Sequence, residues 1–304
     1  MRVSLPVLDE LPSGYFVDES PGGILALHGD VARGLHEAGF GPEHDGRLTR
    51  SELTGRRPLH EIVAGDERMI VRRFSHGGLL RWFTGSRFTD PERPFRELIL
   101  SELLRRAGIP TPRVVAARAR PALGGGWYLD LVARRVEGAT DLGHILGMAR
   151  TKQLDSGCKR AILEATGKIV RQLHRHGCLH ADLTPANILI ESDVLQGAEP
   201  RLWVIDLDRS VIFEKLPSSE RLQNLRRLFR YVKRRESRYG RALSRADYQR
   251  FLRAYEPDRP RRKEILRSIL LAHRRANIFH AFGWFFETLF GRMTDPRESS
   301  TPTG

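Results

Sequence analysis

The chain has 304 residues, and its 51 lysines and arginines against 37 aspartates and glutamates give a formal charge of +14. Hydrophobic residues make up 40% and charged residues 29%, a globular composition that excludes a disordered or collagen-like chain. Its two cysteines, Cys158 and Cys178, cannot form a disulfide scaffold or a structural zinc site alone, and indicate reduced thiols in the cytosol. No apolar run is long enough to predict a secretory signal or a membrane-spanning helix.

The positive charge comes almost wholly from arginine, because the six lysines all lie at or beyond Lys152. This charge indicates an anionic partner such as nucleic acid, acidic lipid or a phosphorylated glycan. A basic surface without a specific partner explains it equally well. Because the chain contains no nucleic-acid recognition motif, we expect no nucleic-acid partner.

Residues 1–45 are predicted as an N-terminal extension that packs on the following lobe, with a short helix at 31–39. Residues 46–137 are predicted as a strand-rich lobe. Within it, strands at 60–63 and 69–74 flank a tight turn at Gly65-Asp66.

A helix is predicted between Pro91 and Gly108, followed by strands at 113–118 and 127–136. Its leucines recur at spacings that place them on or near one face: Leu98, Leu100, Leu103 and Leu104.

Residues 138–293 are predicted as a helical lobe, and 294–304 as a disordered tail. Asp141 is placed to cap a helix at 142–148. The other elements expected here are a long helix at 158–176, short strands at 188–191 and 202–205, and helical residues from 218 to 290. Strands with one helix, followed by a mostly helical half, suggest two lobes with a cleft between them.

The most informative segment is residues 180–190, which read His-Ala-Asp-Leu-Thr-Pro-Ala-Asn-Ile-Leu-Ile; a second apolar strand then ends at Asp206. Phosphoryl transfer needs a carboxylate that orients the acceptor hydroxyl and accepts its proton. It also needs a carboxylate and an amide oxygen that hold Mg²⁺ on the nucleotide phosphates. We therefore predict His180 and Asp182 as catalytic residues, with Asp182 as the base, and Asn187 and Asp206 as metal ligands.

This ordered set resembles the catalytic core of the protein-kinase-like superfamily. The alternative is a helix, loop and strand whose polar residues only cap and turn. The resemblance implies a two-lobed α+β fold, with a small antiparallel β N-lobe that carries one helix and a larger helical C-lobe. It also implies ATP and Mg²⁺ as cofactors.

In that superfamily a lysine on the third strand pairs with a glutamate on the next helix and anchors the α- and β-phosphates. Here no lysine is available, and we predict that Arg72 takes this place, with Arg73 as the second candidate. Arginine binds both phosphate and carboxylate in bidentate fashion, so the exchange is chemically reasonable. Glu97 is the predicted partner on the helix, and Glu102 is the alternative.

Two further positions depart from the superfamily pattern. No Gly-x-Gly-x-x-Gly precedes the arginine-bearing strand, and Gly55 is the candidate for a reduced loop over the phosphates, with an ordinary turn as the alternative. Asp208 stands where kinases usually carry glycine, and it either contacts the metal or pairs with Arg209.

The wider match resembles the 3-deoxy-D-manno-octulosonic acid (Kdo) kinases among the lipopolysaccharide kinases. The arginine-bearing strand and the Asp-Leu-Asp-Arg motif are both similar to segments of that family. The matching segments are residues 71–80, 96–117, 128–142, 206–209 and 224–228.

This resemblance implies an ATP-dependent sugar kinase that phosphorylates a hydroxyl of Kdo on a lipid A precursor. It further implies peripheral association with the cytoplasmic face of the inner membrane. A basic surface suits an acceptor and a leaflet that are both anionic, and the candidate contact surface is Arg221 to Arg241.

Three alternative functions and one structural question remain open from the sequence. A lipopolysaccharide heptose kinase shares the same core, as does a small-molecule phosphotransferase, although the acidic acceptor pocket of the latter suits a basic chain poorly. The missing lysine favours a pseudokinase scaffold, whereas intact Asp182, Asn187 and Asp206 argue against it. The aromatic segment from Phe279 to Phe290 is either a core helix or an interfacial helix on the bilayer.

Overall fold

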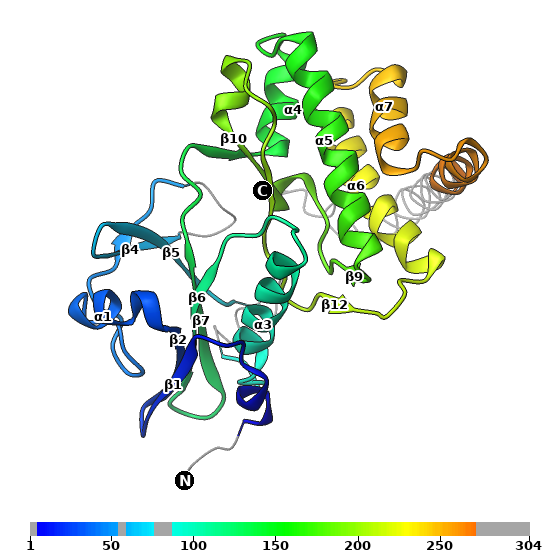
Figure 1. Cartoon of the computed structure of the whole chain (residues 1–304). Coiled ribbons are helices and arrows are strands. Elements are labelled where there is room, and N and C mark those ends of the chain that lie inside the picture. The colour runs from blue at the N-terminus through cyan, green and yellow to red at the C-terminus, as the bar shows by residue number, and fades with distance from the viewer. Residues whose placement is uncertain (1–4, 54–58, 76–86, 272–304) are drawn as a thin grey trace, which may run out of the picture. The chain divides into compact units, whose positions relative to one another are not determined.

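The computed structural model describes residues 5–53, 59–75 and 87–271 (Figure 1). The chain divides into a large unit, Met1–Pro257, and a second unit, Asp258–Gly304, in which residues 259–271 are helical. Gly55, the aromatic segment 279–290 and the tail 294–304 lie outside the described residues. In the part of the chain that is described, no helix has both the length and the hydropathy needed to cross a membrane.

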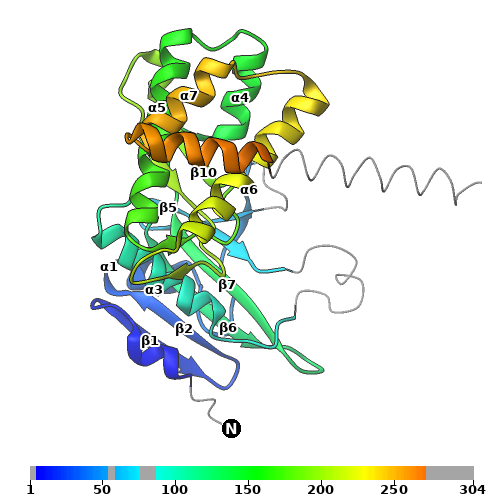
Figure 2. The same ribbon diagram turned by 90° about the vertical axis from the view of Figure 1, so that its right-hand side faces the viewer.

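Seven antiparallel strands form one sheet in the order β1-β2-β6-β7-β5-β4-β3 (Figures 1 and 2). The strands are β1 (Tyr15–Ser20), β2 (Gly23–His28), β3 (Thr49–Arg50), β4 (His60–Ala64), β5 (Glu67–Arg73), β6 (Val114–Pro121) and β7 (Trp127–Arg134). The predicted hairpin is present: β4 pairs with β5, and Gly65 turns between them with a φ of 62°. Residues 15–28, within the predicted N-terminal extension, supply two strands of the same sheet.

Strand β2 shows why its sequence is continuously apolar. Ile24 and Ala26 pack on one face of the sheet with residues of α3 (Arg93–Arg106) and of the 3-10 helix η1 (Pro6–Glu10). Leu25 and Leu27 pack on the other face with α1 (Gly29–Glu37). Alternate residues of a strand face opposite sides, so a strand covered on both faces needs apolar residues at every position.

Helix α3 carries Arg93 and Glu97, two residues of the candidate site described below. It buries Phe95 and Leu98 against the sheet, and it ends before Gly108, whose φ is 75°. A left-handed residue after the last turn is the usual termination of a helix. Of the four leucines expected on or near one face, Leu98, Leu100 and Leu104 are buried, whereas Leu103 is 47% exposed.

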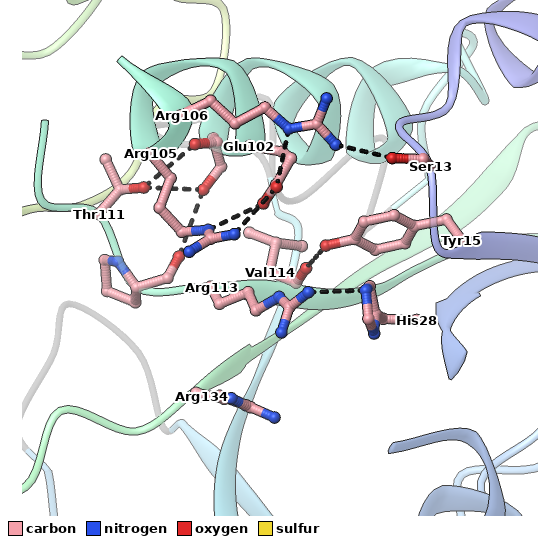
Figure 3. A network of polar contacts seen from close by, with 12 residues as sticks. Ser13, Tyr15, His28, Glu102, Arg105, Arg106, Thr111, Arg113, Val114 and Arg134 are labelled. Carbon is pink, nitrogen blue, oxygen red and sulfur yellow. Dashed lines mark hydrogen bonds and ion pairs between the residues drawn. The ribbon is translucent and has the colours of Figure 1, made fainter. Parts of the chain in front are cut away.

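The N-terminal strand is tied to α3 and β6 by polar contacts (Figure 3). The Tyr15 hydroxyl donates to the carbonyl of Val114, and Arg106 on α3 donates to Ser13 Oγ at 3.2 Å. Together with the packing of η1, these contacts hold α3 in place on the sheet.

The second half of the large unit is mostly helical, with α4 (Leu142–Arg150), α5 (Ser156–Arg175), α6 (Ser218–Tyr239) and α7 (Arg245–Tyr255). The predicted cap of α4 is confirmed, because Asp141 accepts a hydrogen bond of 3.0 Å from the amide of His144. The resulting α+β arrangement, in which an antiparallel sheet with α1 and α3 packed on it precedes a mostly helical part, is the predicted fold class.

Candidate active site

Two short ladders place the predicted catalytic loops side by side. Loop 180–187 connects β9 (Cys178–Leu179) to β10 (Ile188–Glu191), and residues 205–210 connect β11 (Leu202–Val204) to β12 (Val211–Ile212). β9 pairs with β12, and β10 pairs with β11. Because both ends of one loop are paired with both ends of the other, the two loops have to lie next to each other.

The backbone of the first loop is held at three consecutive residues. The amide of His180 donates to Asn224 Oδ1 at 3.1 Å, and that of Ala181 donates to Ser210 Oγ at 3.0 Å. The amide of Asp182 donates to His180 Nδ1 at 3.1 Å, which leaves His180 Nε2 to donate to the carbonyl of Ile205 at 3.1 Å.

His180 is fully buried, and both ring nitrogens are used by backbone groups. Burial lowers the pKa of its imidazole, which keeps the ring neutral, as this pattern of one donor and one acceptor requires. The geometry therefore makes His180 a residue that positions Asp182 and joins the two loops.

Asn187 and Asp206 meet Asp182 at this junction. Asn187 Nδ2 donates to the backbone carbonyl of Asp182 at 2.8 Å, and the amide of Ile205 donates to the carbonyl of Asn187 at 3.1 Å. Asp206 follows directly with a φ of 61°, a left-handed conformation that aspartate tolerates better than most residues. The structure thus brings together the three oxygen-bearing residues that the sequence singles out.

Arg72 links the sheet to both α3 and the second loop. Its guanidinium donates to Glu97 through Nη2 and to Asp206 through Nη1, and it lies 4.5 Å from the centre of the Phe74 ring. Glu97 also accepts a hydrogen bond of 3.1 Å from the amide of Leu207. The expected pairing of Arg72 with Glu97 is present in the geometry, and its role in nucleotide binding stays a prediction.

The pair is electrostatically unusual because Glu97 is only 5% exposed. Burial raises the pKa of Glu97 to about 7, although the nearby Arg72 guanidinium acts in the opposite direction. For Arg72, burial disfavours the charged form, but the carboxylates of Glu97, Asp206 and Asp208 outweigh it and raise the pKa. Arg72 therefore stays charged despite its burial.

The two alternatives to this pair have other partners. Arg73 donates to Asp45 and lies 3.7 Å from Asp130, and Glu102 accepts from Arg105 at 2.9 Å and from its neighbour Arg106 (Figure 3). Gly55 lies outside the described residues, so nothing is added to its prediction.

Asp208 has a partner that the sequence reading did not include. Arg93, at the start of α3, donates to its carboxylate from two nitrogens, with Nε at 2.6 Å from Oδ1. Arg209, the partner considered from the sequence, makes a longer ion pair with Asp208 at 3.7 Å. The Arg93 guanidinium also lies 4.9 Å from the Phe88 ring centre. Through Asp208, the loop of residues 205–210 is thus bound to α3, next to the contacts that Arg72 and Glu97 make with the same loop.

Helix α6 supplies two residues to the catalytic loop. Asn224 accepts from the amide of His180 and donates to its carbonyl at 2.9 Å, and Arg227, one turn later, donates to Asp182 Oδ1 at 2.8 Å. The sequence analysis placed both residues in a matching segment and within the candidate contact surface Arg221 to Arg241, but gave neither a role at the catalytic loop. Their spacing of three on a helix, which puts two polar side chains on one face, is the signal that could have found them.

The donor set is compatible with magnesium bound together with a nucleotide. Asn187 uses its amide nitrogen on Asp182, which leaves its oxygen for a cation, and Asp206 contributes a carboxylate. Within the described residues no group of three or more His, Cys, Asp and Glu side chains could hold a metal alone. Mg²⁺ typically takes one or two protein carboxylates and completes its shell with phosphates and waters.

Comparison with known proteins fits this geometry. Residues 45–255 match the profile of the lipopolysaccharide kinase (Kdo/WaaP) family. The chain belongs to this family. It is accordingly a kinase, a phosphotransferase, and a member of a family that acts in lipopolysaccharide biosynthesis.

Named relatives are similar over most of this family member's length. The 3-deoxy-D-manno-octulosonic acid kinase of Stenotrophomonas maltophilia is 31% identical over 225 residues, which is 71% of this chain and 83% of the relative. The enzyme of the same name from Actinobacillus succinogenes is 30% identical over 190 residues, or 61% of this chain and 74% of the relative.

A solved structure of another protein is similar in fold to this kinase. It is titled "WaaP in complex with acyl carrier protein" and matches with a TM-score of 0.53 at 24% identity, covering 76% of this chain and 87% of that chain. At this identity the likeness shows the fold alone, an antiparallel sheet followed by a helical part.

Proposed function

We propose that this kinase transfers the γ-phosphoryl group of ATP to a hydroxyl of Kdo on a lipid A precursor. The observation that carries the proposal is the convergence of Asp182, Asn187 and Asp206 on two cross-paired loops. The choice of acceptor rests on the relatives named Kdo kinase, which are 30–31% identical to this chain.

In the proposed reaction, Asp182 orients the acceptor hydroxyl and accepts its proton as the oxygen attacks the γ-phosphorus. The bond to the β-phosphate oxygen breaks, and ADP leaves. Arg72, fixed by Glu97, holds the nucleotide phosphates from the side of the sheet. Asn187 and Asp206 would hold Mg²⁺, which neutralises phosphate charge when it is bound.

The first experiment is mass spectrometry of Kdo-lipid A incubated with the full chain and magnesium-ATP, beside a heptosylated acceptor. We expect one added phosphate on Kdo. Phosphate found only on heptose would replace Kdo by heptose as the acceptor, and no transfer to either would refute the proposal.

The second experiment tests the base. Asp182→Asn should lower the rate of transfer by roughly 10²- to 10⁴-fold while ATP still binds, because it removes proton acceptance and preserves shape. Asp66→Asn, in the exposed β4–β5 turn, is the matched control and should retain full activity. A rate unchanged by Asp182→Asn would exclude Asp182 as the base.

We also propose that this enzyme associates peripherally with the cytoplasmic face of the inner membrane. The support is the net charge of +14 and the exposed arginines Arg230, Arg234 and Arg238 along α6. The full chain should float with vesicles containing phosphatidylglycerol and not with pure phosphatidylcholine. Equal flotation of the triple variant with glutamine at these three positions would remove α6 as the contact surface.

A further inference from the structure

The contact between Arg227 and Asp182 has a feature that a purely structural ion pair does not need. Both side chains remain partly open to solvent, with 31% and 29% of their surfaces exposed. A group that approaches Asp182 to deliver a hydroxyl therefore also comes within reach of Arg227.

The catalytic loop supplies no positive charge of its own, since residues 180–187 contain neither lysine nor arginine. Arg227 reaches the loop from α6, and Asn224 one turn earlier fixes the backbone of His180. The guanidinium is thus placed on the same rigid helix that positions the catalytic loop. Rigid placement by a neighbouring contact is what a recognition group requires.

The guanidinium has unused capacity to bind an anion. It carries five N–H donors on three nitrogens, and the contact with Asp182 is made by Nη1. A carboxylate can accept two parallel hydrogen bonds from such a group, which a lysine at this place could not provide.

The surroundings of Arg227 on the helix favour an anionic ligand. Arg230, Arg234 and Arg238 follow at spacings of three, seven and eleven residues, and all three are exposed. At 3.6 residues per turn these positions stay on one side of α6, so Arg227 begins a row of guanidinium groups that starts at the catalytic carboxylate.

We propose that Arg227 is the residue that recognises the acceptor, by pairing with the carboxylate of the sugar whose hydroxyl is placed at Asp182. This rests on the proposed function, because Kdo is a sugar acid and thus offers such a carboxylate beside its hydroxyls. In the absence of the acceptor, Arg227 donates a hydrogen bond to Asp182. When the acceptor binds, other N–H groups of the Arg227 guanidinium donate to its carboxylate.

The test compares two forms of one soluble Kdo glycoside, the free acid and its primary amide, in initial-rate assays with the full chain. The wild-type enzyme should prefer the acid by roughly 10- to 100-fold in kcat/KM, the range expected for a charge-assisted contact. Arg227→Gln should lower kcat/KM for the acid, mainly through KM, by roughly 10- to 100-fold more than it lowers kcat/KM for the amide, so that the preference falls to near one. Arg227→Lys should retain part of it.

Three controls keep the outcomes separate. Arg253→Gln, at an exposed position of α7, should retain the full preference for the acid, and ATP binding should be the same in all variants. An equal loss on acid and amide would overturn the inference, because it would place Arg227 at the γ-phosphate or in a purely structural role. Wild-type enzyme that phosphorylates neither form would instead refute the proposed function, and the inference with it.

Discussion

The loss of Asn224 should damage both the stability of the protein and the geometry of its catalytic loop. The side chain is 3% exposed and makes three hydrogen bonds: to the carbonyl of His180 at 2.9 Å, from the amide of His180 at 3.1 Å, and from His174 Nε2 at 3.2 Å. The two backbone contacts fix the orientation of the amide group. Its oxygen therefore accepts from His174, whose other nitrogen accepts from the Tyr255 hydroxyl at 2.8 Å.

In Asn224→Ala, these three buried partners lose their hydrogen bonds. Each unsatisfied buried group costs about 1–3 kcal/mol, and entry of water into the small space offsets part of this, so we expect a loss of about 3–5 kcal/mol in unfolding free energy. The catalytic loop should also lose its alignment, and a shift of about 1 Å can lower a rate by about 10²-fold.

The assay is urea unfolding together with single-turnover phosphoryl transfer at saturating ATP. Tyr255→Phe is the matched control, because it removes only the far end of the same chain of hydrogen bonds. It should lose about 1 kcal/mol and keep its rate of transfer. A loss below about 1 kcal/mol in Asn224→Ala, or an unchanged rate, would show that Asn224 does not hold the loop.

Two further predictions concern the sites around this loop. In Glu97→Gln a buried acid with a pKa of about 7 is removed. The folded wild type keeps this proton up to about pH 7, whereas the unfolded chain releases it near its usual pKa of 4.5. The unfolding free energy of the wild type, relative to that of the variant, should therefore fall by on the order of 3 kcal/mol as pH rises from 4.5 to 8, as measured by urea unfolding. A difference between the two proteins that does not change with pH would contradict the raised pKa of Glu97. In Gly177→Ala, a Cβ would lie 1.8 Å from the carbonyl oxygen of Phe213 at a residue with a φ of 76°, so the melting curve should show a loss of about 2–5 kcal/mol. Gly197→Ala, left-handed but with nothing within 4 Å, should lose only about 1–2 kcal/mol, and equal losses would rule out the clash.

The parts of the structure that depend on local signals were predictable from the sequence. The β4–β5 hairpin follows from two apolar runs around Gly65, and the start of α4 follows from the capping side chain of Asp141. The proximity of Asp182 and Asp206 was also predictable from the sequence. Asp182 precedes the short apolar strand β10, Asp206 follows the short apolar strand β11, and such strands tend to pair.

The parts that depend on long-range contacts were not predictable in the same way. Strands β1 and β2 were missed because a short apolar run such as Ile24–Leu27 does not by itself distinguish a strand from a buried helix turn. The exposure of Leu103 follows from which side of α3 meets the sheet, and spacing alone does not determine that side.

The partners of the charged residues were the feature least predictable from the sequence. Arg93 and Asp208 are 115 residues apart in sequence, and Arg227 and Asp182 are 45 apart. In a chain with 51 basic residues, sequence cannot select which arginine meets which carboxylate, because that choice is made by packing. Arg72 and Glu97 were selected only because the superfamily pattern supplied the geometry.

The cross-paired loops also determine where the length of this chain can change. An added residue within β9, β10, β11 or β12 would move a ladder out of register and turn Asp182 or Asp206 away from the other. The connection between β10 and β11, which includes the exposed residues 195–199 and the left-handed Gly197, lies outside both loops. Engineers who need to insert a fluorescent reporter or an affinity epitope near the catalytic centre have a tolerant position there, and homologous genes should vary in length at that point.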